Sequence, residues 1–283
     1  KELHNRGVKR VTERLGDDVR KLVEATYTRI DLDLFAPLCS IAILYKTNKA
    51  ATIFHQFLRT NQQPVAADLN SNLEMVVFDS SDDYGQYAGL FFGIDTNNGG
   101  MYLEGNPAQA GNQARFIAYE AEWLRPEFHV WNLTHEMVHY LDGRFNLKGD
   151  FGAARVDSHK TVWWIEGLAE YVSKKNRNDT AITMARTKQF PLSEILANNY
   201  NSGQDRVYRW GYLASRYLIE QHPAKTSQLL QFWRAGDYPR YQALVKSWGT
   251  SLDAGFKQWL DQVSQSELSQ SEVAQAKVAE AKP

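Results

Sequence analysis

The spacing of hydrophobic and polar positions changes twice along the chain. Apolar residues recur at helical spacing over residues 34–61, after a charged, helix-like stretch at residues 1–30. Short apolar runs bounded by turn-forming residues follow, and they predict strands at 75–78, 89–94, 101–103 and 114–119. Helical spacing then returns and predicts helices at 128–142, 162–175, 191–199, 206–221, 225–235, 238–248 and 252–264. The pattern predicts an α+β protein, with a sheet half at about 31–126 and a helical half at about 127–264.

The segment Asn97-Asn98-Gly99-Gly100 precedes the predicted strand that begins with Met101-Tyr102. Asparagine followed by glycine tolerates positive φ, so this segment is typical of a turn that joins two strands into a hairpin. The two glycines could also leave a sheet edge open, because they have no side chain to obstruct a close approach of another backbone. Both interpretations remain open at this point.

Composition and charge exclude several classes of protein. The chain has 283 residues, 43% of them hydrophobic, and a net charge of −1, so it can build a sizeable core and has no excess of basic residues for nucleic acid. No run of 18 uncharged apolar residues is present, so we expect neither a membrane partner nor a membrane span. Cys39 is the single cysteine and is expected to be a buried core residue. We expect a monomer, with linkers at residues 1–30 and 265–283.

The candidate chemistry is concentrated in His135-Glu136-Met137-Val138-His139, an HExxH motif within a predicted helix. Residues four apart lie on one face of a helix, so His135 and His139 can bind one metal ion, and neutral imidazole is a good zinc ligand. Glu136 lies beside the first histidine and can act as general base without binding the ion. The alternative is a buried helix with two hydrogen-bonded core histidines. We expect this helix to end near Gly143, with Asp142 solvated.

A second predicted helix, residues 162–175, carries Glu166 and Glu170 among tryptophans and aliphatic residues. A catalytic zinc takes three protein ligands, and two histidines with one glutamate form a known set, which makes Glu166 the natural third ligand. Glu170 lies one turn later and could accept a hydrogen bond from a ligating histidine. The alternative for both glutamates is a solvated helix face, which their apolar neighbours disfavour because unpaired buried carboxylates are costly.

These motifs resemble the catalytic domains of bacterial collagenases of the Vibrio and clostridial type, which are gluzincin metallopeptidases. The resemblance covers roughly residues 70–260 and depends on three segments: His135 to Phe145, Trp163 to Tyr171, and Asn98 to Glu104. It implies a thermolysin-like fold with a small mixed sheet followed by helices. It also implies a secreted zinc endopeptidase that cuts collagen or gelatin. In that family other domains flank the peptidase part, so the chain resembles the peptidase part alone.

The resemblance assigns further roles to individual residues. It places Gly99, Gly100, Met101 and Tyr102 on the edge strand that binds an extended substrate. Glu104 matches a glutamate that helps to bind calcium. In related gluzincins a tyrosine three residues before a glycine stabilises the oxyanion, which corresponds here to Tyr208 before Gly211. Tyr212 is the reserve candidate for that role.

Two other functions compete with an endopeptidase. A gluzincin aminopeptidase would need an acidic anchor for the substrate amine near the edge strand, and the first carboxylate there is Glu104. A collagen-binding module without activity would be expected to lack a ligand or the base, whereas the histidines, Glu136 and Glu166 are all present. The sequence therefore favours the endopeptidase.

Overall fold

The computed structural model describes residues 30–31, 36–125, 128–149 and 157–265. The chain divides into two compact units, Lys1–Phe151 and Gly152–Pro283. The expected linker segments lie outside the described residues apart from Ile30 and residue 265, and so does the side chain of Cys39. No described helix is long and apolar enough to cross a membrane.

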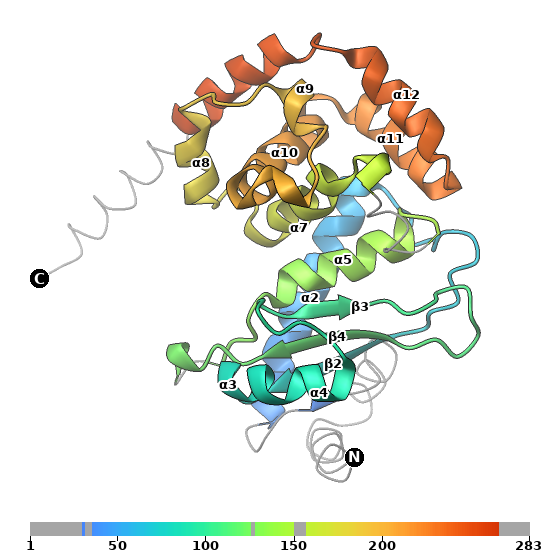
Figure 1. Cartoon of the computed structure of the whole chain (residues 1–283), viewed down its shortest axis with the longest axis vertical. Coiled ribbons are helices and arrows are strands. Elements are labelled where there is room, and N and C mark those ends of the chain that lie inside the picture. Colours follow the sequence, from blue (N-terminus) through green and yellow to red (C-terminus); the bar gives the residue numbers. More distant parts are fainter. Residues whose placement is uncertain (1–29, 32–35, 126–127, 150–156, 266–283) are drawn as a thin grey trace, which may run out of the picture. The chain divides into compact units, whose positions relative to one another are not determined.

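The first unit contains a four-stranded mixed sheet with the strand order β1-β2-β4-β3. Figure 1 labels three of these strands, β2, β4 and β3. β1 (Ile30–Asp31) and β4 (Ala114–Tyr119) both pair with β2 (Leu73–Phe78) in parallel. β3 (Met101–Leu103) pairs antiparallel with β4 and forms one edge of the sheet. The strands predicted at 75–78, 101–103 and 114–119 are thus confirmed, as is the mixed α+β class.

Two long helices complete the first unit. α2 (Ala36–Leu58) packs against α5 (Leu133–Phe145), and α5 also contacts β3 and β4. Side chains from these elements form the buried core, among them Phe54, Leu58, Met75, Phe116, Ile117, Met137 and Val138. The HExxH helix therefore belongs to the sheet unit, which extends to Phe151, and not to the helical unit that begins beyond it.

The prediction of a strand at 89–94 is wrong. This part of the chain is helical: α3 (Ser81–Asp83), a π-helical turn (Tyr84–Ala88) and α4 (Gly89–Phe92) follow one another. Ser80 caps the start, because its side chain accepts a hydrogen bond from the backbone N–H of Asp83. A hairpin at 97–100 is excluded as well, since the segment before it is not a strand.

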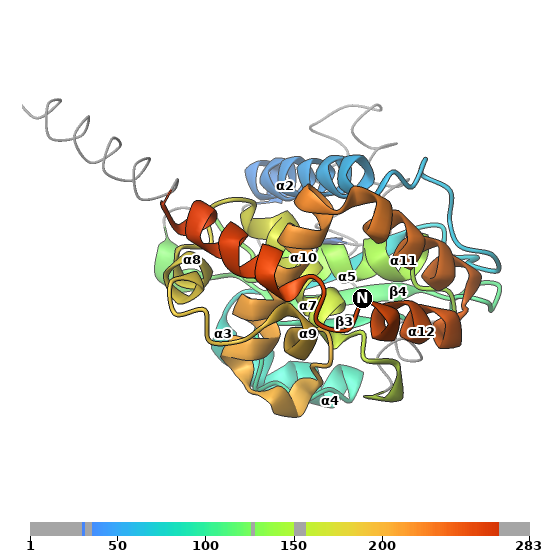
Figure 2. The same ribbon diagram turned by 90° about the horizontal axis from the view of Figure 1, so that it is seen from above.

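The second unit is helical, as the sequence predicts. Its helices are α7 (Val162–Lys174), α8 (Asp179–Ala185), α9 (Leu192–Ile195), α10 (Gly211–Gln221), α11 (Pro223–Ala235), α12 (Tyr238–Trp248) and a further helix at 253–265. α8 was not predicted, whereas the others overlap the predicted ranges. Figure 2 shows these helices from a second direction.

α7 and α10 cross at two glycines. A Cβ atom built on Gly167 would lie 2.2 Å from the carbonyl oxygen of Gly211 and 2.6 Å from the Oγ of Ser215. Only glycine at position 167 lets the two helix backbones approach so closely. Trp163 and Trp164 of α7 are fully buried and pack against the fully buried Trp233 of α11. The crossing holds in place the helix that carries Glu166 and Glu170.

Candidate functional site

The position of the HExxH helix is set by the end of β4. Glu120 and Val130 form an isolated β-bridge, and the backbone N–H of Trp131 donates to the carbonyl oxygen of Tyr119 at 3.0 Å. Asn132 then adopts a left-handed conformation, with φ of 53°, and α5 begins at Leu133. These contacts attach the first turn of α5 to the sheet.

α5 continues past Gly143, so the predicted C-cap is wrong and the cap is Asn146. The backbone N–H of Asn146 donates to the carbonyl oxygen of Asp142 at 2.9 Å, and its side-chain amide donates to the Asp142 carboxylate at 2.7 Å. Asp142 is 1% exposed, which contradicts the expectation that it is solvated. A buried carboxylate is acceptable here because the Asn146 side chain donates a hydrogen bond to it.

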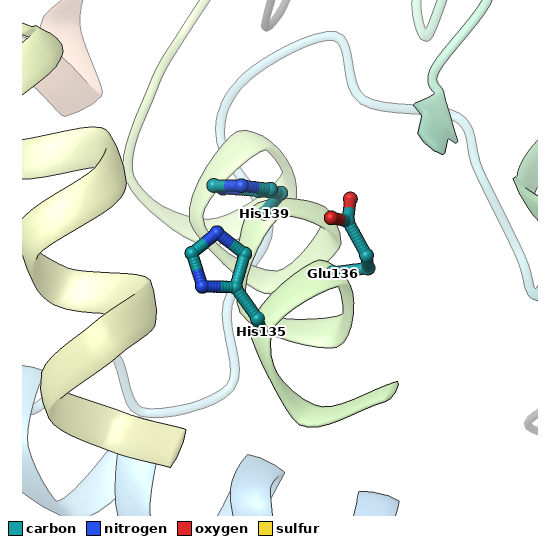
Figure 3. A group of neighbouring side chains, drawn as sticks. All are labelled: His135, Glu136 and His139. Atoms are coloured by element: carbon teal, nitrogen blue, oxygen red, sulfur yellow. The ribbon is translucent and has the colours of Figure 1, made fainter. Parts of the chain in front are cut away.

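α5 brings His135, Glu136 and His139 together. Their candidate ligand atoms all lie within 4.8 Å of one another, and all three residues are buried. The two imidazole rings have centroids 4.7 Å apart and are nearly perpendicular, at 87°. Figure 3 shows the rings on successive turns, with the Glu136 carboxylate beside them. No other group of three His, Cys, Asp or Glu side chains this close occurs in the part of the chain that the structure describes.

The donor set of this group suits a divalent metal ion. Zinc accepts imidazole nitrogen at about 2.0–2.1 Å, so two ligating nitrogens must lie within about 4 Å of each other, which the helical spacing allows. Imidazole ligands favour zinc, copper, iron or nickel over magnesium and calcium, which prefer oxygen. The residues therefore fit a metal site of the zinc type.

The two glycines before β3 bring the sheet edge close to the start of α5. A Cβ atom on Gly99 would lie 2.3 Å from the amide nitrogen of Asn132 and 2.6 Å from the indole nitrogen of Trp131. Gly100 has a φ of +129°, and a Cβ atom there would lie 3.0 Å from the carbonyl oxygen of Ile117. Gly100 therefore requires glycine, and side chains of Trp131 and Asn132 occupy the space beside Gly99, which explains the double glycine without a hairpin.

Asn98 and Tyr84 hold this glycine segment. The Tyr84 hydroxyl donates to the Asn98 Oδ1 at 2.5 Å, and the same oxygen accepts the backbone N–H of Gly100 at 3.1 Å. Burial raises the pKa of Tyr84 to about 12, and the negative charge of Glu136 contributes to this increase. Tyr84 thus connects the glycine segment with the surroundings of Glu136. The sequence analysis missed Tyr84, because nothing in the pattern distinguishes it from the other tyrosines.

Glu104 follows the edge strand and is buried. The Tyr102 hydroxyl donates to its carboxylate at 3.4 Å, and the side-chain amide of Asn112 donates to its carbonyl oxygen at 2.8 Å. Burial raises the pKa of Tyr102 well above its ordinary value, and the charge of Glu104 adds to this effect. The structure therefore places one buried carboxylate at this point of the sheet edge.

In the second unit, α7 buries both glutamates that the sequence analysis singled out. Glu166 is 5% exposed and accepts a hydrogen bond from the Tyr200 hydroxyl at 2.7 Å. Glu170 is 6% exposed, and its carboxylate accepts from the Lys174 ammonium group at 2.6 Å and from the Asn178 amide at 3.2 Å. The interpretation of these residues as a solvated helix face is wrong. Tyr200 has no distinctive sequence pattern and was missed.

The two candidate oxyanion donors differ in their surroundings. Tyr208 is half-buried in a π-helical turn (Asp205–Trp210), a rare conformation that is frequent at functional sites. Tyr212 is fully buried on α10, where its hydroxyl donates to the carbonyl oxygen of Lys175 at 2.5 Å and accepts from Arg216 at 3.0 Å. The hydroxyl of Tyr212 therefore has a structural role.

The known proteins that are similar to the chain include several bacterial collagenases. The chain is 48% identical over 208 residues to the microbial collagenase of Vibrio alginolyticus, a match that covers 73% of the chain and 25% of that relative. It is 42% identical to the microbial collagenase of Vibrio parahaemolyticus, with 74% and 25% covered. Collagenase ColA of Bacillus cereus is a more distant relative, 22% identical over 76% of the chain and 23% of its own length.

The chain spans about a quarter of the length of these curated relatives. The model of the collagenase family (Peptidase M9) matches residues 40–259. This range includes α5, α7 and the segment around Tyr208. On this evidence the chain belongs to the collagenase family of peptidases.

Proposed function

We propose that the chain is the peptidase part of a secreted zinc endopeptidase that hydrolyses peptide bonds in collagen and gelatin. The observation that carries this proposal is the buried group of His135, Glu136 and His139 in a chain of the collagenase family. Both compact units would form one thermolysin-like peptidase domain, residues 31–264, flanked by linkers at 1–30 and 265–283. The protein would act as a monomer.

The proposed zinc ligands are His135, His139 and Glu166. The two imidazoles are adjacent on α5, and Glu166 is a buried carboxylate whose hydrogen bond with Tyr200 limits its movement. Glu170 would orient a ligating histidine from a neighbouring position, since a carboxylate that accepts from an imidazole N–H fixes the tautomer. When bound, zinc polarises the scissile carbonyl group and makes water a stronger nucleophile.

The residues of the chain would perform the proton transfers. Glu136 takes a proton from the attacking water and passes it to the leaving amine, since its carboxylate lies beside the two histidines. The Tyr208 hydroxyl donates a hydrogen bond to the oxygen that becomes negative in the tetrahedral intermediate. We prefer Tyr208 because it is half-buried, whereas Tyr212 is fully buried and its hydroxyl binds Lys175 and Arg216.

The substrate would bind along β3 as an additional strand. β3 is the edge of the sheet, so Met101 and Tyr102 have backbone groups on the side away from β4. Gly99 and Gly100 directly precede this strand, and we assign them to the same substrate-binding edge because of the family resemblance. Recognition through backbone hydrogen bonds tolerates many side chains, which suits a protease acting on long repetitive chains.

Calcium is proposed as a structural ion at Glu104. The support for this is a buried carboxylate at the end of the edge strand, together with the family resemblance of its segment. Calcium takes six to eight oxygen ligands, many of them backbone carbonyls, and oxygen atoms near Gly143 are candidates to complete the set. Glu104→Gln should then abolish any increase of melting temperature that calcium produces.

A quenched collagen-like peptide with both ends blocked tests the proposed function. We expect internal cleavage by the protein as purified, loss of cleavage after chelation, and its return when zinc is restored. Glu136→Gln should be inactive in all three of these conditions. Cleavage only of peptides with a free N-terminus would favour an aminopeptidase. Stoichiometric zinc binding without cleavage of either peptide would contradict the proposal and favour a binding module.

A further inference from the structure

The hydrogen bond between Tyr200 and Glu166 connects two parts of the second unit that are 34 residues apart. The hydroxyl donates to the carboxylate Oε1 at 2.7 Å, an ordinary length for a hydrogen bond between two oxygen atoms. Glu166 is buried, whereas 37% of Tyr200 is exposed. The tyrosine ring thus lies at the surface while its hydroxyl reaches an interior carboxylate.

The turn that carries Tyr200 is well defined. Tyr200–Ser202 forms a single 3-10 turn with a capping box at its start. The Asn199 side chain accepts the backbone N–H of Asn201 at 3.0 Å, and the Ser202 hydroxyl accepts the backbone N–H of Asn199 at 3.1 Å. These bonds restrict the backbone on both sides of Tyr200.

A second set of contacts attaches this turn to the rest of the unit. Asn198 is fully buried, and its side chain exchanges two hydrogen bonds with Arg206, at 2.6 and 2.9 Å. Arg206 in turn pairs with the Glu194 carboxylate at 2.6 Å and lies 5.0 Å above the Phe190 ring. The turn is therefore supported on both sides, and Tyr200 is not on a free loop.

We propose that Tyr200 is a positioning residue for metal binding, whose hydroxyl holds Oε1 of Glu166 so that the other carboxylate oxygen is presented to the metal ion. The inference rests on the proposed function, in which Glu166 is the third zinc ligand. The last torsion of a glutamate side chain is broad, so a carboxylate without a fixed partner samples many orientations. A donor on one oxygen removes that freedom before the metal arrives.

Such partners of ligating residues have measurable effects. Removal of a hydrogen-bond partner of a metal ligand typically lowers metal affinity or activity about 10- to 100-fold. The competing explanation is that Tyr200 only satisfies a buried carboxylate, which would stabilise the fold without affecting the metal. The two explanations differ in whether zinc affinity changes.

A matched control is present in the same unit. The Tyr171 hydroxyl donates to the Glu220 carboxylate at 2.8 Å, which is the same chemistry at nearly the same distance. Tyr171 is also on α7, but its partner is not a proposed ligand. Tyr200→Phe and Tyr171→Phe therefore each remove one tyrosine–glutamate hydrogen bond, and only the first involves Glu166.

The experiment measures the zinc dissociation constant of each variant of the whole chain by competition with a chromophoric chelator, and the melting temperature of each metal-free protein. We expect both variants to lower the melting temperature slightly, whereas only Tyr200→Phe should weaken zinc binding, by about 10-fold or more. The visible spectrum of the cobalt-substituted protein should also change in Tyr200→Phe and remain unchanged in Tyr171→Phe.

Equal zinc affinity of Tyr200→Phe and the unmodified chain would overturn the inference, and so would an equal loss in both variants. Glu166→Ala separates this result from a failure of the proposed function. If Glu166→Ala weakens zinc binding and Tyr200→Phe does not, only the positioning role is wrong. If Glu166→Ala binds zinc normally, the proposed ligand is wrong and the positioning role is overturned with it.

Discussion

At the scale of single residues, the roles proposed for His135, Glu136 and His139 differ although the three side chains lie together. Glu136→Gln preserves the shape of the side chain and removes its basicity. We expect kcat to decrease about 10²- to 10⁴-fold, the usual contribution of a general base, with zinc affinity nearly unchanged. Turnover of the blocked peptide and metal content after dialysis would measure both. Near-normal turnover would show that another group is the base.

Tyr208 and Tyr212 provide a second comparison between residues. Tyr208→Phe should decrease kcat about 10²- to 10³-fold with little change in KM, which is the effect of removing one oxyanion donor. Tyr212→Phe should instead destabilise the fold by about 1–3 kcal/mol, because the carbonyl oxygen of Lys175 loses its buried donor. Steady-state kinetics and thermal unfolding of both variants would test this. The opposite pattern would assign the oxyanion role to Tyr212.

At this scale a functional residue can be predicted from the sequence when its role requires a fixed separation from another residue. Residues whose roles require no such separation are missed. The separation of four residues between His135 and His139 places their rings together on any helix, and the structure has them together. Tyr84, Asn98 and Tyr200 follow no such rule, because each reaches its partner through tertiary structure. The chain has 14 tyrosines, so residue type alone could not identify them.

At the scale of elements, the crossing of α7 and α10 depends on Gly167. Gly167→Ala would place a methyl group 2.2 Å from the backbone oxygen of Gly211, which cannot rotate away as a side chain can. Alanine favours a helix by about 1 kcal/mol over glycine, but overpacking in a core typically costs about 1–3 kcal/mol or more, so we expect a net loss of stability. Thermal unfolding followed by circular dichroism would measure it.

Gly85 is the matched control for that prediction. It lies in the π-helical turn before α4, and a Cβ atom there would meet nothing within 4 Å. Gly85→Ala should therefore leave stability unchanged or increase it by up to about 1 kcal/mol. If both alanine variants unfolded at the same temperature, the close helix crossing would not limit stability.

The error at residues 89–94 shows why elements of this kind are difficult to predict. A short apolar run can be a strand or a helical segment, and periodicity alone does not distinguish the two. The cue for a helix was Ser80 followed by Asp83, whose backbone N–H it caps. Leu90 and Phe91 are 81% and 74% exposed, so the apolar run does not form a buried strand. Hydrophobicity was mistaken for burial.

At the scale of the whole molecule, the order of sheet and helices was predictable but the division into units was not. Local patterns place a helix at 34–61 and then the strands before residue 126, and they place only helices after it. The first unit nevertheless extends to Phe151, because α5 packs against α2, β3 and β4. Such contacts join segments far apart in the chain, and local periodicity does not predict which distant segments pack together.

The buried tyrosines determine how the whole molecule responds to alkali. Burial raises the pKa of Tyr84 to about 12, and it also raises the pKa values of Tyr102, Tyr140 and Tyr241. In the unfolded chain these hydroxyls ionise near pH 10. Above that pH the folded state retains protons that the unfolded state has lost, so the free energy of unfolding decreases as pH increases, by at most about 1.4 kcal/mol per pH unit for each tyrosine.

We therefore expect full stability below about pH 10 and a progressive loss between about pH 10 and 12. Tyr84→Phe isolates one contribution. The variant loses its hydrogen bond to Asn98 and should be less stable at pH 8, yet its stability should decrease less steeply above pH 10, because phenylalanine has no proton to lose. Denaturant titrations at several pH values would measure both slopes. Parallel slopes would show that Tyr84 ionises in the folded protein as readily as in the unfolded chain.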